Sequence, residues 1–177
     1  IHRAVAESLE KSVPGEPTPE QAAALTHHWH RSAALPGGER GVPYAVAAAE
    51  AATDRYAYAE AADAWAIALE LLGEDDDREE AIRRARFESV VLAGCSGDEL
   101  LAEAREVGTW LAAQVGPDAA ADQVATALRL SAGDFGAEES WALAALARRW
   151  LAPDRRDVTW LLVRVQELEE ADFSDPA

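Results

Sequence analysis

The chain has 177 residues, of which 49% are hydrophobic, and a formal net charge of −17. A surface this acidic repels phosphate backbones and anionic lipids, so nucleic acid and membranes are not expected as direct partners. The single cysteine, Cys95, excludes an intrachain disulfide, and we expect it to be a buried structural thiol near a helix end.

Ala, Leu, Glu and Arg dominate the composition, and β-branched residues are sparse, so the sequence predicts an all-α fold. Turn and capping signals divide it into about nine helices. The first is expected at 2–12. Thr18 is then predicted to cap the second helix, with Pro19 at its first position and Gln21 closing a capping box. This helix is expected to reach about Ala34 and to stop before a Pro-Gly-Gly sequence.

The third and fourth helices are predicted at 42–54 and 57–72. Asp77 with Glu80, and Ser96 with Glu99, form capping-box patterns that open the next two, which run to about 93 and 115. The last three are expected to end near 131, 151 and 170. The ninth carries an apolar stripe at helical spacing, which predicts its buried face: Val158, Leu161, Leu162, Val165 and Leu168.

Links of only a few residues favour antiparallel neighbouring helices. Successive hairpins of roughly 35–45 residues then predict a right-handed solenoid, and a compact helical bundle is the alternative. We expect a helical linker region at 1–38, helical repeats at 39–172 and a frayed tail at 173–177. Trp150 and Trp160 are either core residues or part of an apolar contact surface.

The fourth predicted helix resembles the second helix of a tetratricopeptide (TPR) repeat. The residues that carry the resemblance are an aromatic after the turn, a small residue at the helix crossing, a large aromatic and a second small residue: Tyr58, Ala61, Trp65 and Ala68. The third helix departs from the TPR pattern, because four alanines stand where larger residues are usual. A TPR-like unit implies a scaffold that holds a partner.

Residues 1–73 also resemble the region that follows the nucleotide-binding and winged-helix parts of STAND-class regulatory ATPases. These include the maltose-regulator-like and antibiotic-regulator-like transcription factors of actinobacteria. The resemblance rests on the order of 2–10, the Leu25-Thr26-His27-His28-Trp29 sequence and the Ala-rich hairpin. It implies a sensor arm that receives an inducer or a partner protein. The chain has neither a phosphate-binding loop nor a basic recognition helix. It contains no Met, so we expect it to be a piece of a longer protein.

In a TPR unit the first helix lines the concave face. Transferring that pattern predicts a partner-binding face that is acidic and suited to a basic or amphipathic peptide: Val46, Glu50, Thr53 and Asp54. Every exposed helix face presents such residues, so an ordinary solvated face is the alternative.

Other residue groups are assigned structural roles. His27 and His30 are three apart and are expected to face the same way, with His28 pointing elsewhere. Without further ligands they are not expected to bind a metal. The acidic run 74–80 is expected to stabilise a helix N-terminus. No catalytic residues are predicted, because no nucleophile–base pattern is recognisable.

The sequence therefore predicts a non-catalytic sensor and interaction scaffold without a cofactor, in the cytoplasm. Its partner would be a protein, a peptide or the rest of its own parent chain, and a small-molecule inducer is compatible with this role. The alternatives are a free-standing acidic TPR-like adaptor and a small-molecule-binding helical bundle.

Overall fold

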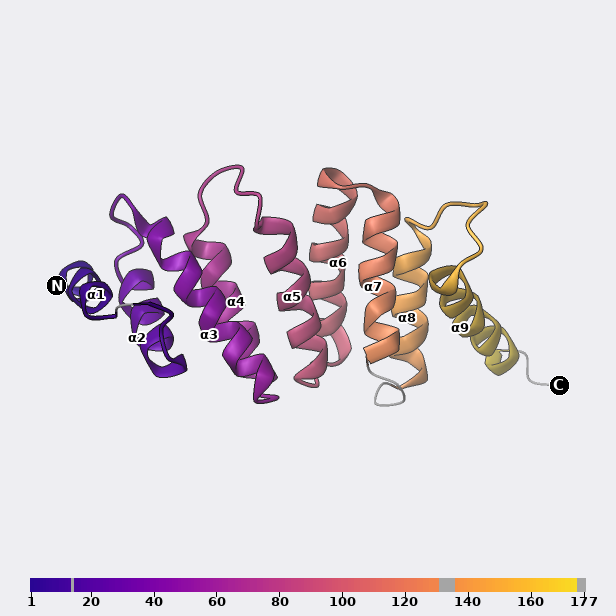
Figure 1. The fold of residues 1–177 in the computed structure, drawn as a ribbon. Coiled ribbons are helices and arrows are strands. Elements are labelled where there is room, and N and C mark those ends of the chain that lie inside the picture. The colour runs from indigo at the N-terminus through magenta and orange to yellow at the C-terminus, as the bar shows by residue number, and fades with distance from the viewer. Residues whose placement is uncertain (14, 131–135, 175–177) are drawn as a thin grey trace. The chain divides into compact units, whose positions relative to one another are not determined.

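The computed structural model describes residues 1–13, 15–130 and 136–174. These ranges contain nine α-helices, one 3-10 helix and no strand, which confirms the all-α prediction (Figure 1). The helices are α1 (His2–Ser12), α2 (Pro19–His30), η1 (Gly38–Gly41), α3 (Val42–Asp54), α4 (Tyr58–Leu71), α5 (Glu79–Leu92), α6 (Gly97–Gln114), α7 (Pro117–Leu130), α8 (Ala137–Arg148) and α9 (Val158–Ser174).

The chain divides into two compact units, Ile1–Ser89 and Val90–Ala177. The first unit contains both the region expected to precede the repeats and the α3–α4 hairpin. The assignment of 39–172 to repeats stays a prediction. Of the tail expected to be frayed, 173–174 belong to α9 and 175–177 lie outside the described residues.

The start of α2 forms as its sequence predicts. The backbone N–H of Gln21 donates to the Thr18 hydroxyl, and the N–H of Thr18 donates to the Gln21 side chain, at 3.3 and 2.9 Å. The helix ends at His30, four residues earlier than expected, because the amides of Ser32 and Ala33 bond three residues back instead of four. The Ser32 hydroxyl also donates to the carbonyl oxygens of His28 and Trp29.

The predicted side-chain cap by Ser96 is wrong. Ser96 makes no side-chain capping bond; the N–H of Gly97 instead donates to Glu139 of α8, whose carboxylate also accepts from Gly136 at 3.1 Å. One carboxylate thus serves the first turns of both α6 and α8. The α5 helix begins at Glu79, and its preceding turn is closed by Asp76, which accepts from the backbone and guanidinium of Arg78. These bonds lower the pKa of Asp76 to about 2.

The core of the first unit lies among α2, α3 and α4 and is made largely of alanine. Trp29 is its largest fully buried side chain. A methyl group at Gly41 would lie 2.5 Å from Trp29 Cβ and 2.7 Å from Leu71 Cδ1. Glycine at this position therefore allows the start of α3 to lie against both α2 and α4.

In the second unit, the fully buried side chains come from α6, α7, α8 and α9: Leu100, Leu111, Val124, Leu143 and Val163. Trp150 is half-buried, and its ring lies where a methyl group at Gly108 would be, with atoms 2.6 and 2.7 Å away. Trp150 therefore packs within its own unit. Trp160 is half-buried beneath the Arg156 guanidinium, 4.9 Å from the ring centroid.

The segment before α9 is held to α7 by Arg155. Its guanidinium donates to Asp122 and Asp157 at 2.5 Å and to Asp118 at 3.3 Å. The Thr159 hydroxyl donates to the same Asp122 carboxylate at 2.6 Å. α8 ends at Arg148, three residues before the expected position, and α9 extends four residues beyond its expected end.

The predicted buried face of α9 is wrong. Leu162 is half-buried, but Val158, Leu161, Val165 and Leu168 are each more than 40% exposed. Val163, which lies outside the predicted stripe, is fully buried. A hydrophobic period identifies an apolar face but not the neighbour that covers it, and α9 turns Val163 toward the core of its unit.

Candidate functional site

The α3–α4 hairpin places the predicted repeat residues in two environments. Ala61 and Ala68 are fully buried and Trp65 is 7% exposed, whereas Tyr58 is half-buried at the start of α4. Ala61, Trp65 and Ala68 pack with the buried alanines of α3 in one core cluster. Small side chains on both helices permit a close approach of their backbones, the packing that a TPR-like hairpin requires. The TPR assignment itself stays a prediction.

The turn between the two helices adds a residue that the sequence did not single out. α3 ends in a Schellman motif, in which the N–H of Ala57 donates to Ala52 O and the N–H of Tyr56 to Thr53 O, both at 2.9 Å. Tyr56 has φ +60°, a conformation that normally favours glycine. Its side chain is 78% exposed and makes an edge contact with Tyr58 at 6.2 Å between ring centroids.

The four residues of the predicted partner-binding face, Val46, Glu50, Thr53 and Asp54, are hereafter called the α3 face. Val46 packs against the core, while the other three are exposed. The Thr53 hydroxyl donates to Ala49 O at 2.9 Å. Within the described part of the chain, the carboxylates of Glu50 and Asp54 have no hydrogen bond or ion pair. Tyr56, whose ring is exposed, stands two residues beyond Asp54 in the turn that follows α3.

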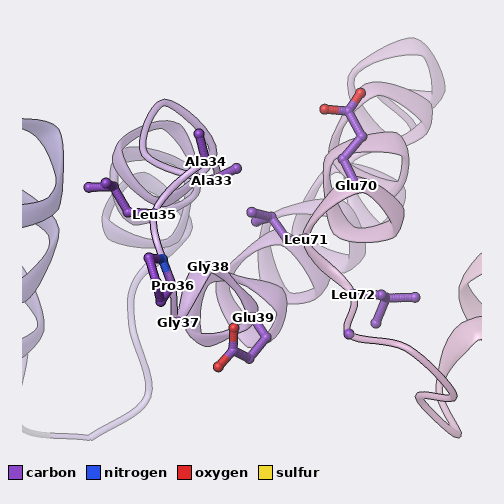
Figure 2. A pocket seen from close by; sticks show the side chains of 11 residues that line it. Ala33, Ala34, Leu35, Pro36, Gly37, Gly38, Glu39, Glu70, Leu71 and Leu72 are labelled. Atoms are coloured by element: carbon purple, nitrogen blue, oxygen red, sulfur yellow. The ribbon is translucent and has the colours of Figure 1, made fainter.

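A cavity of about 400 Å³ lies in the same unit, between the segment after α2 and the end of α4. Figure 2 shows Leu71 between the two walls, with the carboxylates of Glu39 and Glu70 at its edges. The remaining lining is small and mainly apolar: Ala33, Ala34, Leu35, Pro36, Gly37, Gly38, Leu72 and Gly73. The Glu70 carboxylate lies 2.6 Å from His30 Nε2.

A smaller cavity of about 200 Å³ lies between α1 and α2 and is more apolar. Its walls include Leu9, Val13 and Leu25, with Glu20 and Gln21 from the first turn of α2. The carboxylate of Glu20 has a lowered pKa, chiefly because it accepts a hydrogen bond from its own backbone and then one from the Thr18 hydroxyl. Both are local bonds within the helix cap.

The histidines are not arranged as the sequence predicts. His30 does not share a direction with His27; it pairs with Glu70. His27 and His28, which are adjacent in sequence, instead gather with His2 of α1. One ligand-type nitrogen from each ring lies within 4.8 Å of the others. The prediction failed because it considered the spacing within one helix, whereas the third ring comes from another.

Next to these histidines, α1 is fixed to α2 by Arg3. Its guanidinium lies 4.3 Å from the Trp29 ring centroid. It donates to the carbonyl oxygens of Ser32, Leu35 and Gly37 at 3.0–3.2 Å, just beyond the end of α2. A cation at a helix C-terminus is favoured by the helix dipole. Arg40 also lies over the Trp29 ring, at 4.8 Å, and pairs with Glu10 of α1.

Cys95 is half-buried, not fully buried as expected. Burial raises the pKa of its thiol, and the nearby carboxylates of Glu99 and Glu103 raise it further. A raised pKa keeps the sulfur protonated at neutral pH, where a thiol is a poor nucleophile. The structure therefore gives Cys95 the character of a packing residue.

Comparisons of this chain with protein-family models, curated proteins and solved structures found no match. In the ranges that the structure describes, no helix is both long and apolar enough to cross a membrane.

Proposed function

We propose that this chain is a non-catalytic interaction scaffold whose α3 face binds a basic or amphipathic peptide segment of a partner protein. One observation carries the proposal: Glu50 and Asp54 are exposed carboxylates one helical turn apart, with no partner among the residues that the structure describes, on a helix whose opposite side is buried. A rigid helix that presents unpaired charge fits a partner of opposite charge. Tyr56 would supply the aromatic contact that interfaces commonly use.

The experiment measures binding of fluorescent helical peptides with Lys or Arg at i and i+4, beside a charge-reversed Glu set. We expect the basic set to bind and its Kd to rise with salt, since exposed charge pairs are screened. In the double variant Glu50→Gln, Asp54→Asn, the Kd should rise about three- to tenfold, the effect of losing two exposed ion pairs.

The matched control is the double variant Glu16→Gln, Glu74→Gln. It removes the same charge from two exposed loop positions of the same unit. If the control weakens binding as much as the α3 variant, the attraction comes from net charge alone and the α3 face is not the site. Equal binding of basic and acidic peptides would also contradict the proposal.

We further propose that the chain is the sensor arm of a larger cytoplasmic STAND-type ATPase, arranged as a TPR-like solenoid. Partner or inducer binding would stabilise one arrangement of the helices and so bias the attached switch. The support is the order of motifs in residues 1–73 together with the closely packed α3–α4 hairpin. The parent coding sequence tests this: it should encode a phosphate-binding loop upstream, and an open reading frame without one would contradict the assignment.

A small-molecule inducer is the second candidate ligand, and the cavity in Figure 2 favours it. Its volume of about 400 Å³ is within the range of small-ligand sites. The carboxylates of Glu39 and Glu70 at the edge of the hollow suit a small organic cation. Such a ligand should raise the melting temperature of the chain, and Ala34→Phe, which fills the cavity from an exposed position, should abolish the rise.

A further inference from the structure

We propose that His2, His27 and His28 form a binding site for one divalent transition-metal ion of the zinc class. This inference goes beyond the proposed peptide binding, because it uses α1 and α2 and none of the residues of the α3 face. The structure assigns three imidazole ligands to the ion and leaves a further coordination position for water or a small ligand.

The distances between the rings fit such a site. His2 Nδ1 and His28 Nδ1 are 2.9 Å apart, and ring centroids in the three pairs are separated by 5.2–5.7 Å. One nitrogen from each histidine lies within 4.8 Å of the other two. Zinc–nitrogen bonds of about 2.0–2.1 Å in a tetrahedron place ligand nitrogens roughly 3.4 Å apart. The rings therefore need only small rotations to close around an ion.

The fold itself places the three rings together. Arg3 stacks on Trp29 and donates to backbone oxygens just beyond the end of α2. This contact fixes where α1 lies along α2. His2 immediately precedes Arg3, and His28 immediately precedes Trp29, so the same contact brings His2 to His28. His27 lies one residue further back on α2 and completes the group.

The contact between the Nδ1 atoms of His2 and His28 favours the form of imidazole that binds metals, because a hydrogen bond between them requires one ring nitrogen to accept with a lone pair. Imidazole nitrogen suits Zn²⁺, Ni²⁺ and Cu²⁺, whereas Mg²⁺ and Ca²⁺ prefer oxygen ligands.

His30 provides the internal control. It lies on α2 only two residues beyond His28, yet its ring contacts Glu70 of α4 and does not belong to the group. If the chain bound metal through any accessible histidine, His30 would contribute as much as the other three. The proposed site therefore predicts that metal binding weakens when His2, His27 or His28 is replaced and stays unchanged when His30 is replaced.

The experiment is a calorimetric titration of the full chain, without a polyhistidine tag, with Zn²⁺ at pH 7.5 and with Mg²⁺ as the control ion. We expect one Zn²⁺ per chain, no Mg²⁺ binding and a raised melting temperature in Zn²⁺. His2→Asn, His27→Asn and His28→Asn should each weaken Zn²⁺ binding at least about tenfold, because even supporting residues of metal sites have effects of that size.

Circular dichroism establishes that each variant keeps its helix content, and His2→Asn lies in the first turn of α1, where disturbance of the fold is least. His30→Asn should bind Zn²⁺ as the unchanged chain does. Binding should weaken at pH 5.5 as protons compete for the rings. The proposal is overturned if the chain binds no Zn²⁺, or if His2→Asn and His28→Asn bind it with unchanged affinity. A Zn²⁺ site lost in His30→Asn would overturn it equally.

Discussion

The helices α1 and α9 are attached to their own units by different means. α1 buries only Ala6 completely, and its contacts with α2 and η1 rely on Arg3 and on the pairing of Glu10 with Arg40. α9 buries Val163 and leaves a row of larger apolar side chains exposed. The contrast teaches that helical amphipathicity does not measure attachment: α1 combines the apolar contacts of Ala6 and Leu9 with several polar bonds, while α9 has more apolar surface than its unit covers.

The largest loss of stability is expected at Trp29, whose ring lies beneath the side chains of Arg3 and Arg40. Replacing this fully buried ring in Trp29→Ala should lower the free energy of unfolding of the first unit by about 3–5 kcal/mol. Trp160→Ala on α9 removes a half-buried ring and should cost much less. Urea denaturation followed by circular dichroism measures both. Equal losses would show that the attachment of α9 depends on Trp160 as strongly as α1 depends on Trp29.

The second test compares two arginines that each lie over a tryptophan. Arg3→Ala removes charged hydrogen bonds to three backbone oxygens, and we expect a loss of about 2–3 kcal/mol. Arg156 lies over Trp160 but donates only to nearby loop oxygens. Arg156→Ala should cost less than about 1 kcal/mol. If the Arg3→Ala chain is as stable as the Arg156→Ala chain, the polar bonds of Arg3 do not attach α1.

A third test concerns close packing against tryptophan in the two units. Gly41→Ala places a methyl group against Trp29 Cβ, which cannot rotate away, and should cost about 1–3 kcal/mol. At Gly108 the obstacle is the far end of the half-buried Trp150 ring, so Gly108→Ala should cost less. Gly73→Ala, where nothing lies within 4 Å, is the control. Thermal denaturation ranks the three variants, and a reversed order would contradict the packing argument.

The last test compares two positions on α9, one of which should give the smallest effect. Val163→Ala removes two buried methyl-sized groups and should cost about 1.5–2 kcal/mol. Leu161→Gln lies on the exposed row and should change stability by less than about 0.5 kcal/mol. Chemical denaturation of both variants decides which face is covered. A large loss of stability in Leu161→Gln, with none in Val163→Ala, would show that the face predicted from the sequence is the covered one.

Local chemistry made most helices predictable. Thr18, Pro19 and Gln21 define the start of α2 through bonds that span three residues, so no tertiary contact is needed to foresee them. Ala61, predicted as the small residue at the helix crossing, is likewise fully buried. The turn between α3 and α4 lies where the sequence predicts it, but the positive φ of Tyr56 was not foreseen, because tyrosine is uncommon in that conformation and the surrounding Schellman bonds hold it there.

The candidate sites were less predictable because their residues meet across long stretches of sequence. The histidine group needs His2 beside His28, and this requires the packing of α1 on α2, of which the Arg3–Trp29 contact is a part. The cap of α6 comes from Glu139, 42 residues away from Gly97, so a search of neighbouring residues selected Ser96 instead. The α3 face could be proposed in advance, but the sequence could not show that its two carboxylates are unpaired.

The Glu139 carboxylate accepts hydrogen bonds at the starts of both α6 and α8, so the opening of one helix is coupled to the opening of the other. Gly97 can keep its amide hydrogen from exchanging with solvent only while α8 is in place to accept it. The same carboxylate holds the first turn of α8. Local opening of either helix therefore exposes the start of the other, so α6 and α8 should exchange and unfold as one cooperative element, although α7 lies between them in the sequence.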